Sequence, residues 1–210
     1  MKKESIISWL IAIIGIIILV SIFYSSRHSP PMSQPDFKAN VNSEELPGME
    51  TGGAPWPAEI TNLKERLTII GLPVLSAEGT NFHIHQHIDI LVSKNKIEVP
   101  AGIGISEDEQ FISPVHTHDG TGIIHIESDS KADFTLGQFF DVWGLRFSKD
   151  CIGSYCSGDD REVAVFINGK ETSGDPRAVV LEPHQEIAVV YGSAKDLPPI
   201  PQSYAFPPDY

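Results

Sequence analysis

Histidine is concentrated in two short segments, HIHQHID and HTHDGTGIIHIE, which together hold six of the eight histidines of the 210-residue chain. These six are His83, His85, His87, His116, His118 and His125. Imidazole nitrogen is a common ligand of divalent transition metals, so this grouping predicts a metal site. The less specific alternatives are ordinary exposed polar residues, or a hydrogen-bonded network that stiffens the fold without an ion.

Acidic residues accompany the histidines, and the spacing limits how many side chains one ion can take. Asp89, Asp119 and Glu127 could bind the ion through an oxygen or accept a hydrogen bond from the second ring nitrogen of a ligating histidine. On a strand, histidines two residues apart are separated by roughly 7 Å at their roots and can converge, whereas His83 and His87 are roughly 13 Å apart. We therefore expect that one of the first three histidines is not a ligand, or that two ions bind.

The donor types favour some metals over others. A nitrogen-rich set with a few carboxylates and no nearby thiolate or Met-rich motif favours Cu(II) first and Zn(II) next, over Cu(I), Ca(II) or Mg(II). A blue-copper centre is not expected, because it requires a cysteine thiolate and both cysteines lie far from the histidines in the sequence. The metal cofactor predicted here is thus copper(II) or zinc(II).

These residues predict a protein that binds a transition metal for sequestration, delivery or sensing. Two other classes stay open. The same histidines could serve a metal-dependent enzyme, either a cupin-like oxygenase or isomerase or a metallohydrolase, or the domain could be an envelope protein-interaction module. No catalytic residue can be assigned, because the chain has neither a G-x-S-x-G nucleophile motif nor a phosphate-binding glycine loop.

Period-two alternation predicts the strands that carry these side chains. From residue 83 to 92 the histidines occupy one face and isoleucines the other, and in 123–128 His125 and Glu127 share a face. Lys94-Asn95 is expected to turn the first strand into a partner. Residues 163–167 and 187–191, with an Asn168-Gly169 turn after the first of them, supply the last strands.

Two helices are also expected. The capping box Thr135-x-x-Gln138 predicts a helix from Leu136 to about Trp143 that ends at Gly144. Apolar residues at helical spacing within 57–71 predict a short amphipathic helix that packs against the domain over 82–192. The fold class is therefore α+β, with a mixed sheet and one helix packed on it.

The order of these elements and the segments VFINGK and EIAVVYG, over residues 83–192, resemble a β-grasp domain such as the C-terminal domain of transcobalamin-like proteins. The HxHxH motif followed by HTHD also resembles an uncharacterised family of bacterial membrane-anchored proteins. These resemblances imply a β-grasp-like sheet and a membrane anchor. They imply no activity, since function depends on the site and not on the fold.

The N-terminal segment predicts a membrane location. Residues 6–24 contain no charge and are long enough for a single transmembrane helix in a lipid bilayer. Lys2 and Lys3 precede the span and only Arg27 follows it closely, so residues 1–5 are expected in the cytoplasm and the domain outside it. A cleaved signal peptide is the main alternative.

The remaining segments and the charge complete the predicted organisation. Residues 25–56, rich in small and polar residues, are expected to form a flexible tether, and the proline-rich tail 193–210 to be mobile or to act as a strap. In an oxidising compartment Cys151 and Cys156 are expected to form a disulfide. A net charge of -13 excludes nucleic acid as a natural partner, because a phosphate-binding surface needs excess lysine and arginine.

Overall fold

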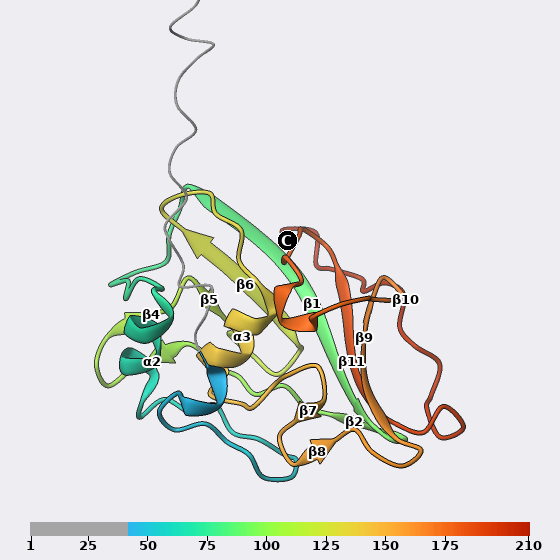
Figure 1. The fold of residues 1–210 in the computed structure, drawn as a ribbon. Helices are drawn as coiled ribbons and strands as arrows, with labels where there is room; N and C mark the ends of the chain where they lie inside the picture. The colour runs from blue at the N-terminus through green and yellow to red at the C-terminus, as the bar shows by residue number, and fades with distance from the viewer. Residues whose placement is uncertain (1–41) are drawn as a thin grey trace, which may run out of the picture. The chain divides into compact units, whose positions relative to one another are not determined.

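The computed structural model describes residues 42–210, which fold as an α+β domain with one large mixed sheet (Figure 1). Within these residues there are two α-helices, α2 (Leu63–Ile70) and α3 (Leu136–Trp143). The strands of the large sheet are β1 (Phe82–Val92), β2 (Asn95–Ile97), β5 (Val115–His116), β6 (Ile123–Ser128), β9 (Glu162–Ile167), β10 (Lys170–Glu171) and β11 (Glu186–Gly192).

Shorter elements lie outside the large sheet. Two small hairpins are formed by β3 (Ile105–Ser106) with β4 (Phe111–Ile112) and by β7 (Cys151–Ile152) with β8 (Tyr155–Cys156). Two short 3-10 helices, η1 (Ser43–Glu45) and η2 (Pro176–Ala178), complete the elements. The predicted disulfide is confirmed, because Cys151 and Cys156 are bonded across the second hairpin.

The long strand β1 lies at the centre of the sheet, whose order is β10-β9-β11-β1-β6-β5. It runs parallel to β11 and antiparallel to both β6 and β2. Its first half pairs with β6 and its second half with β2, and both antiparallel partners lie on the side opposite β11. The predicted strands and the Asn168-Gly169 turn are confirmed, and both turn residues have the positive φ that this hairpin turn requires. The turn expected at Lys94-Asn95 lies one residue earlier, at Ser93-Lys94, because Val92 pairs with Asn95.

The two faces of the sheet differ in chemistry. Ile88, Ile90 and Ile126 lie on one face, in the main hydrophobic core with Phe139 of α3. Because side chains alternate along a strand, the odd-numbered residues of β1, including the histidines, lie on the opposite face. The hydrophobic core on one face therefore fixes the strands, and the strands position the polar side chains on the opposite face.

Helix α3 forms where its capping box predicts. The Thr135 hydroxyl accepts a hydrogen bond from the Gln138 amide, and the Gln138 side chain accepts one from the Thr135 amide. Gly144 ends the helix with a φ of 79°, a left-handed conformation that glycine adopts without a steric penalty. The prediction of this helix from sequence is confirmed at both ends.

Helix α2 is shorter than the range 57–71 expected for it. The residues before Leu63 use their backbone groups elsewhere: the Pro57 carbonyl accepts a hydrogen bond from the Trp143 indole, and the Glu59 amide donates to the Trp143 carbonyl. The Glu59 side chain accepts from the Asn62 amide, just before the first turn. The apolar stripe is nevertheless buried as predicted, because Leu63 and Leu67 pack in the core.

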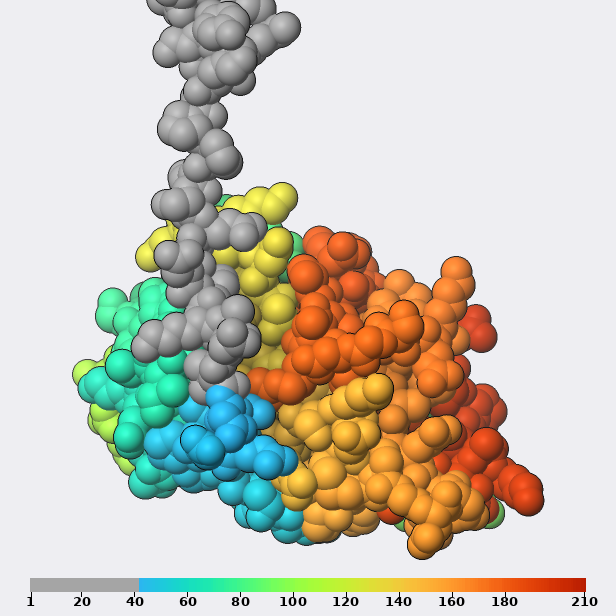
Figure 2. Space-filling model, in the orientation of Figure 1, coloured from blue at the N-terminus to red at the C-terminus, as the bar shows by residue number. Residues whose placement is uncertain are grey.

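The expectation that a flexible tether extends to residue 56 is wrong for its last part, because residues 42–56 pack on the domain (Figure 2). Leu46 and Trp56 are buried, and the Trp56 ring makes an edge contact with Trp143 at 6.4 Å between centroids. Glu50 also exchanges backbone hydrogen bonds with Gly144 and Arg146. The segment is mostly polar, so its composition alone does not predict that these few apolar residues anchor it to the domain.

The tail after residue 192 lies along the polar face of the sheet as a strap. Leu197 and Ile200 pack against a second small cluster that includes Leu91 and Val190. Further on, the Tyr204 ring stacks on His87 with 3.8 Å between centroids. Of the two alternatives for this tail, the strap is the one that the structure contains.

The predicted transmembrane helix at 6–24 and the start of the tether lie outside the described residues. Among residues 42–210, no helix has both the length and the hydropathy needed to cross a membrane.

Candidate metal centre

Three histidines form a row across neighbouring strands. His85 on β1 is directly opposite His125 on β6, and His125 is in turn opposite His116 on β5. One step along the same face, His83 is opposite Glu127. Since residues paired across an antiparallel ladder have neighbouring side chains, the sheet register itself brings these donors together.

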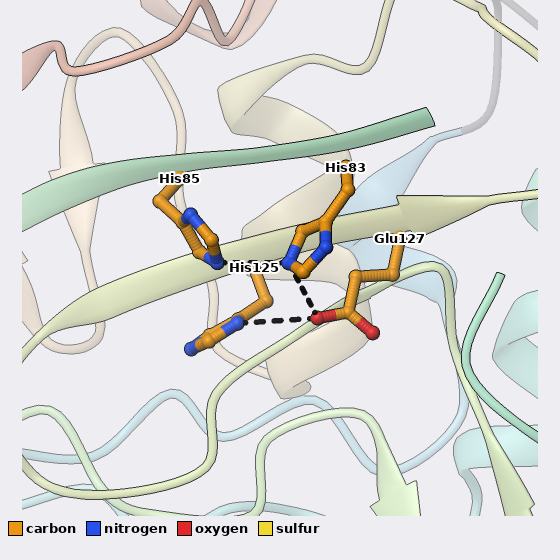
Figure 3. Close-up of side chains that lie close together, drawn as sticks. All are labelled: His83, His85, His125 and Glu127. Atoms are coloured by element: carbon orange, nitrogen blue, oxygen red, sulfur yellow. Dashed lines mark hydrogen bonds and ion pairs between the residues drawn. The ribbon is translucent and has the colours of Figure 1, made fainter. Parts of the chain in front are cut away.

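Figure 3 shows His83, His85, His125 and Glu127 with their side chains directed toward one another. The Nε2 atoms of His83 and His85 are 3.0 Å apart, and His83 Nε2 is 3.0 Å from Glu127 Oε1. His125 Nδ1 lies 3.4 Å from the same carboxylate oxygen. One ligand atom from each of these four residues lies within 4.8 Å of all the others.

A second group of donors shares two members with the first. His116 and His118 bring their Nε2 atoms to 3.2 Å of each other. Together with His125 and Glu127 they offer four ligand atoms that also lie within 4.8 Å of one another. We refer to the five histidines of both groups, with Glu127, as the histidine cluster.

Burial keeps key imidazoles of the cluster neutral. It is the main cause that lowers the pKa of His85 to about 4, with further lowering by His125 and His83. Burial also lowers the pKa of His116 to about 4, against the opposing effect of the Glu127 charge. A neutral imidazole has a free nitrogen lone pair, so both side chains are in the metal-binding form at neutral pH.

Glu127 supplies the negative charge of the cluster. Its burial would raise the pKa of the carboxyl, but the interaction with His125 and the charges of His116 and His83 lower it to about 2. The side chain is only 5% exposed, and it is ionised at neutral pH. An anionic oxygen at the centre of several imidazoles is the donor set of a divalent transition-metal site.

One buried nitrogen argues against a closed hydrogen-bonded network. His125 Nδ1 is buried, and its contact with Glu127 Oε1, at 3.4 Å, is longer than an ordinary hydrogen bond. A buried polar atom in a folded protein normally has a close partner, so this long contact is consistent with a site that an ion completes. A metal bound at this nitrogen would satisfy it.

His87 is not part of the cluster, although the sequence places it among the candidate ligands. Its Nδ1 is 2.8 Å from Glu186 Oε2 on β11, and its Nε2 is 3.0 Å from the Thr121 carbonyl oxygen. A carbonyl only accepts, so Nε2 must carry a proton and donate it. Both ring nitrogens are therefore engaged, and the Tyr204 ring covers the imidazole.

Asp89 lies with His87, away from the cluster. His87, Asp89 and Glu186 offer a third set of ligand atoms within 4.8 Å of one another. We interpret this set as a buried hydrogen-bonded and ionic group, because Lys96 already forms an ion pair with the Asp89 carboxylate and both His87 nitrogens are occupied. A cation beside the Lys96 ammonium would be repelled.

Asp119 is exposed at the rim. Its Oδ1 accepts hydrogen bonds from the Thr121 amide and hydroxyl, and these bonds are the main cause that lowers the pKa of Asp119. Asp119 thus fixes the loop between His118 and His125 and adds negative charge nearby. It is not among the residues that the structure groups as potential ligands.

Sequence reasoning did not identify two residues at the edge of the cluster. Glu78 Oε1 lies 3.4 Å from His118 Nε2, and the Tyr210 ring lies 4.2 Å from the His85 ring between centroids. His184, which is exposed, contacts the Tyr210 backbone oxygen through its own Nε2. Neither Glu78 nor Tyr210 belongs to a histidine segment, so only long-range contacts could place them here.

Comparison with known proteins adds no assignment. No protein-family model matches the chain, and neither curated proteins nor solved structures include a significant match. The chemistry of the site therefore carries the functional argument.

Proposed function

We propose that the protein binds a divalent transition-metal ion through the histidine cluster, with Cu(II) as the first candidate and Zn(II) as the second. The observation that carries the proposal is the convergence of imidazoles from β1, β5 and β6 on one ionised carboxylate, with the buried Nδ1 of His125 only 3.4 Å from that carboxylate. Neutral imidazoles beside an anionic oxygen suit both ions.

The preference for copper follows from the donor types. At a nitrogen-rich site, Cu(II) binds more tightly than the other divalent ions of the first transition row. Five of the six donors in the cluster are imidazoles, and the only two cysteines of the chain are joined to each other. The cluster therefore has no thiolate that would favour Cu(I).

We further propose that this site works outside the cytoplasm, in metal sequestration, delivery or sensing, in a protein anchored by residues 6–24. The disulfide between Cys151 and Cys156 supports an oxidising compartment, where such bonds persist. The net charge of -13 supports a cation as the bound species, because it raises the local cation concentration.

We also infer a β-grasp-like topology for the sheet. Its support is the parallel pairing of β1 with β11 at the centre, with the antiparallel partners of each strand on the outer sides. Helix α3 lies in the chain between these two groups of strands, which agrees with the order expected from the sequence.

A competition titration of the full-length chain, purified in mild detergent and stripped of metal with a chelator, tests the proposal. Cu(II) and Zn(II) are added against a chromophoric chelator of known affinity. We expect the protein to withdraw metal from the chelator at pH 7. The absence of any competition with either ion would contradict the proposal.

The matched variants are His85→Ala with His125→Ala, and His184→Ala. The double substitution removes two of the three imidazoles of the first donor group. We expect the metal affinity to fall at least tenfold, because the loss of a group that only supports a ligand already lowers metal affinity by this factor. His184→Ala removes an exposed histidine outside the cluster and should retain the affinity of the unmodified chain. Equal losses in both variants would indicate unspecific surface binding.

A further inference from the structure

We propose that the histidine cluster is a binuclear centre, in which two divalent metal ions share the Glu127 carboxylate. One ion would be held by the pair His83 and His85, and the other by the pair His116 and His118. This inference rests on the proposed metal-binding function. Beyond that function, it specifies that two ions bind and that the Glu127 carboxylate bridges them.

The spacing within each histidine pair fits adjacent ligands on one ion. Two nitrogens bound at about 2.1 Å and at tetrahedral or right angles are roughly 3.0–3.4 Å apart. The Nε2 atoms of His83 and His85 are 3.0 Å apart, and those of His116 and His118 are 3.2 Å apart. Each pair is thus arranged as neighbouring ligands of its own ion.

The two pairs do not fall within reach of a common ion. The donors divide into two groups of four, and no group contains both pairs, although the limit between ligand atoms is as wide as 4.8 Å. Opposite ligands on a single ion are only roughly 4.2 Å apart. A single ion would leave one pair of buried or half-buried imidazoles without a metal.

Glu127 is the donor that can serve both ions. It belongs to both groups, and a carboxylate has two oxygens with about four lone-pair positions between them. Neutral imidazole offers one lone pair, so His125 completes the coordination of one ion only. Carboxylate bridging places the ions roughly 3.5–4 Å apart, the separation found in two-metal sites.

Negative charge around the cluster offsets the repulsion between two dications. Besides Glu127, the Glu78 carboxylate is 3.4 Å from His118 Nε2, and Asp119 interacts electrostatically with His118 and His125. Opposite charges at such distances favour binding of the second ion. The Lys96 ammonium on β2 forms an ion pair with the Asp89 carboxylate.

The test is the stoichiometry of Zn(II) binding to the full-length chain, measured by the same chelator competition. We expect two equivalents for the unmodified protein and one for each pair variant, His83→Ala with His85→Ala and His116→Ala with His118→Ala. His184→Ala should keep two equivalents. Saturation at one equivalent would overturn the binuclear centre and leave metal binding intact, whereas no binding at all would overturn both.

The shared carboxylate is tested separately with Cu(II), in a way that does not depend on variants that fold poorly. Two Cu(II) ions roughly 4 Å apart interact magnetically, so the electron paramagnetic resonance spectrum at two equivalents should be broadened and should integrate to fewer than two isolated spins. Glu127→Gln should lose this interaction. Two equivalents with the spectrum of isolated ions in the unmodified chain would overturn the bridge.

Discussion

His85 and His125 are direct cross-strand partners on β1 and β6, and their rings meet edge to face with 4.6 Å between centroids. The next strand extends this row to His116, which is the partner of His125 on its other side. The metal-binding proposal depends on this register, because a shift by one residue would move the side chains of one strand to the opposite face of the sheet.

Replacement of His87 should reduce stability without reducing metal binding. In the His87→Ala variant the Glu186 carboxylate, which is 1% exposed, loses its contact with the His87 imidazole at 2.8 Å. Leaving a buried acceptor without its hydrogen bond in this way costs about 1–3 kcal/mol. Urea denaturation of the metal-free protein should give a lower free energy of unfolding, and the number of metal equivalents should stay that of the unmodified chain. Loss of metal at unchanged stability would make His87 a ligand.

The metal-free protein should become less stable as the pH falls from about 6.5 to about 4. In the unfolded chain His85 and His116 take up protons near their ordinary pKa of 6.5, but in the folded protein only near 4. Acid therefore favours the unfolded state across this interval. Glu127 acts in the same direction below pH 4.5, since its pKa in the folded protein is about 2.

Urea denaturation at pH 7.0, 5.5 and 4.5 in the presence of a chelator measures this dependence. The double variant His85→Gln with His116→Gln provides the control, because it lacks both titrating groups. Its free energy of unfolding should fall less over the same interval. A parallel decline in the variant and the unmodified protein would contradict the assignment of the acid sensitivity to these two histidines.

Replacement of Thr135 should destabilise helix α3 but leave the cluster intact. Thr135→Ala removes the hydroxyl that accepts from the Gln138 amide at 3.3 Å, and loss of such a cap costs about 1 kcal/mol. Thr135→Ser keeps the hydroxyl and should retain most of the stability. Chemical denaturation compares the two, and equal stabilities of the alanine and serine variants would show that the cap contributes nothing measurable.

Replacement of Tyr210 should speed the release of bound metal. The ring packs against His85 and the edge of His125, with 4.2 and 5.4 Å between centroids, so it shields this part of the cluster from solvent. In Tyr210→Ala we expect a severalfold faster dissociation when excess chelator is mixed with the loaded protein, while Tyr210→Phe should behave as the unmodified chain. An unchanged release rate in the alanine variant would mean that the strap does not cover the site.

The sequence predicts the facing of the histidines well, because alternation along a strand is local. In the structure the histidines of strand 83–92 share one face, and His125 and Glu127 of strand 123–128 lie opposite them, as the period-two pattern requires. The capping box likewise locates α3 from four neighbouring residues. These features depend on interactions between residues close in the chain.

Other features depend on pairing between distant segments and could not be predicted in this way. His87 has the same spacing as His83 and His85, but only the pairing of β1 with β11 places Glu186, 99 positions away, beside it. Trp56 anchors a segment whose composition is otherwise that of a tether. Tyr210 contacts the cluster because the strap crosses the sheet, and the local sequence pattern does not predict where the strap runs.

X-ray absorption spectroscopy of the metal-loaded full-length protein tests the central claim most directly, since it reports the atoms bound to the ion. We expect a first shell of nitrogen and oxygen at about 2.0–2.1 Å, with the outer-shell scattering that imidazole rings produce, for Zn(II) and for Cu(II). A shell of oxygen alone, without imidazole scattering, would contradict the proposal that the histidine cluster binds the metal.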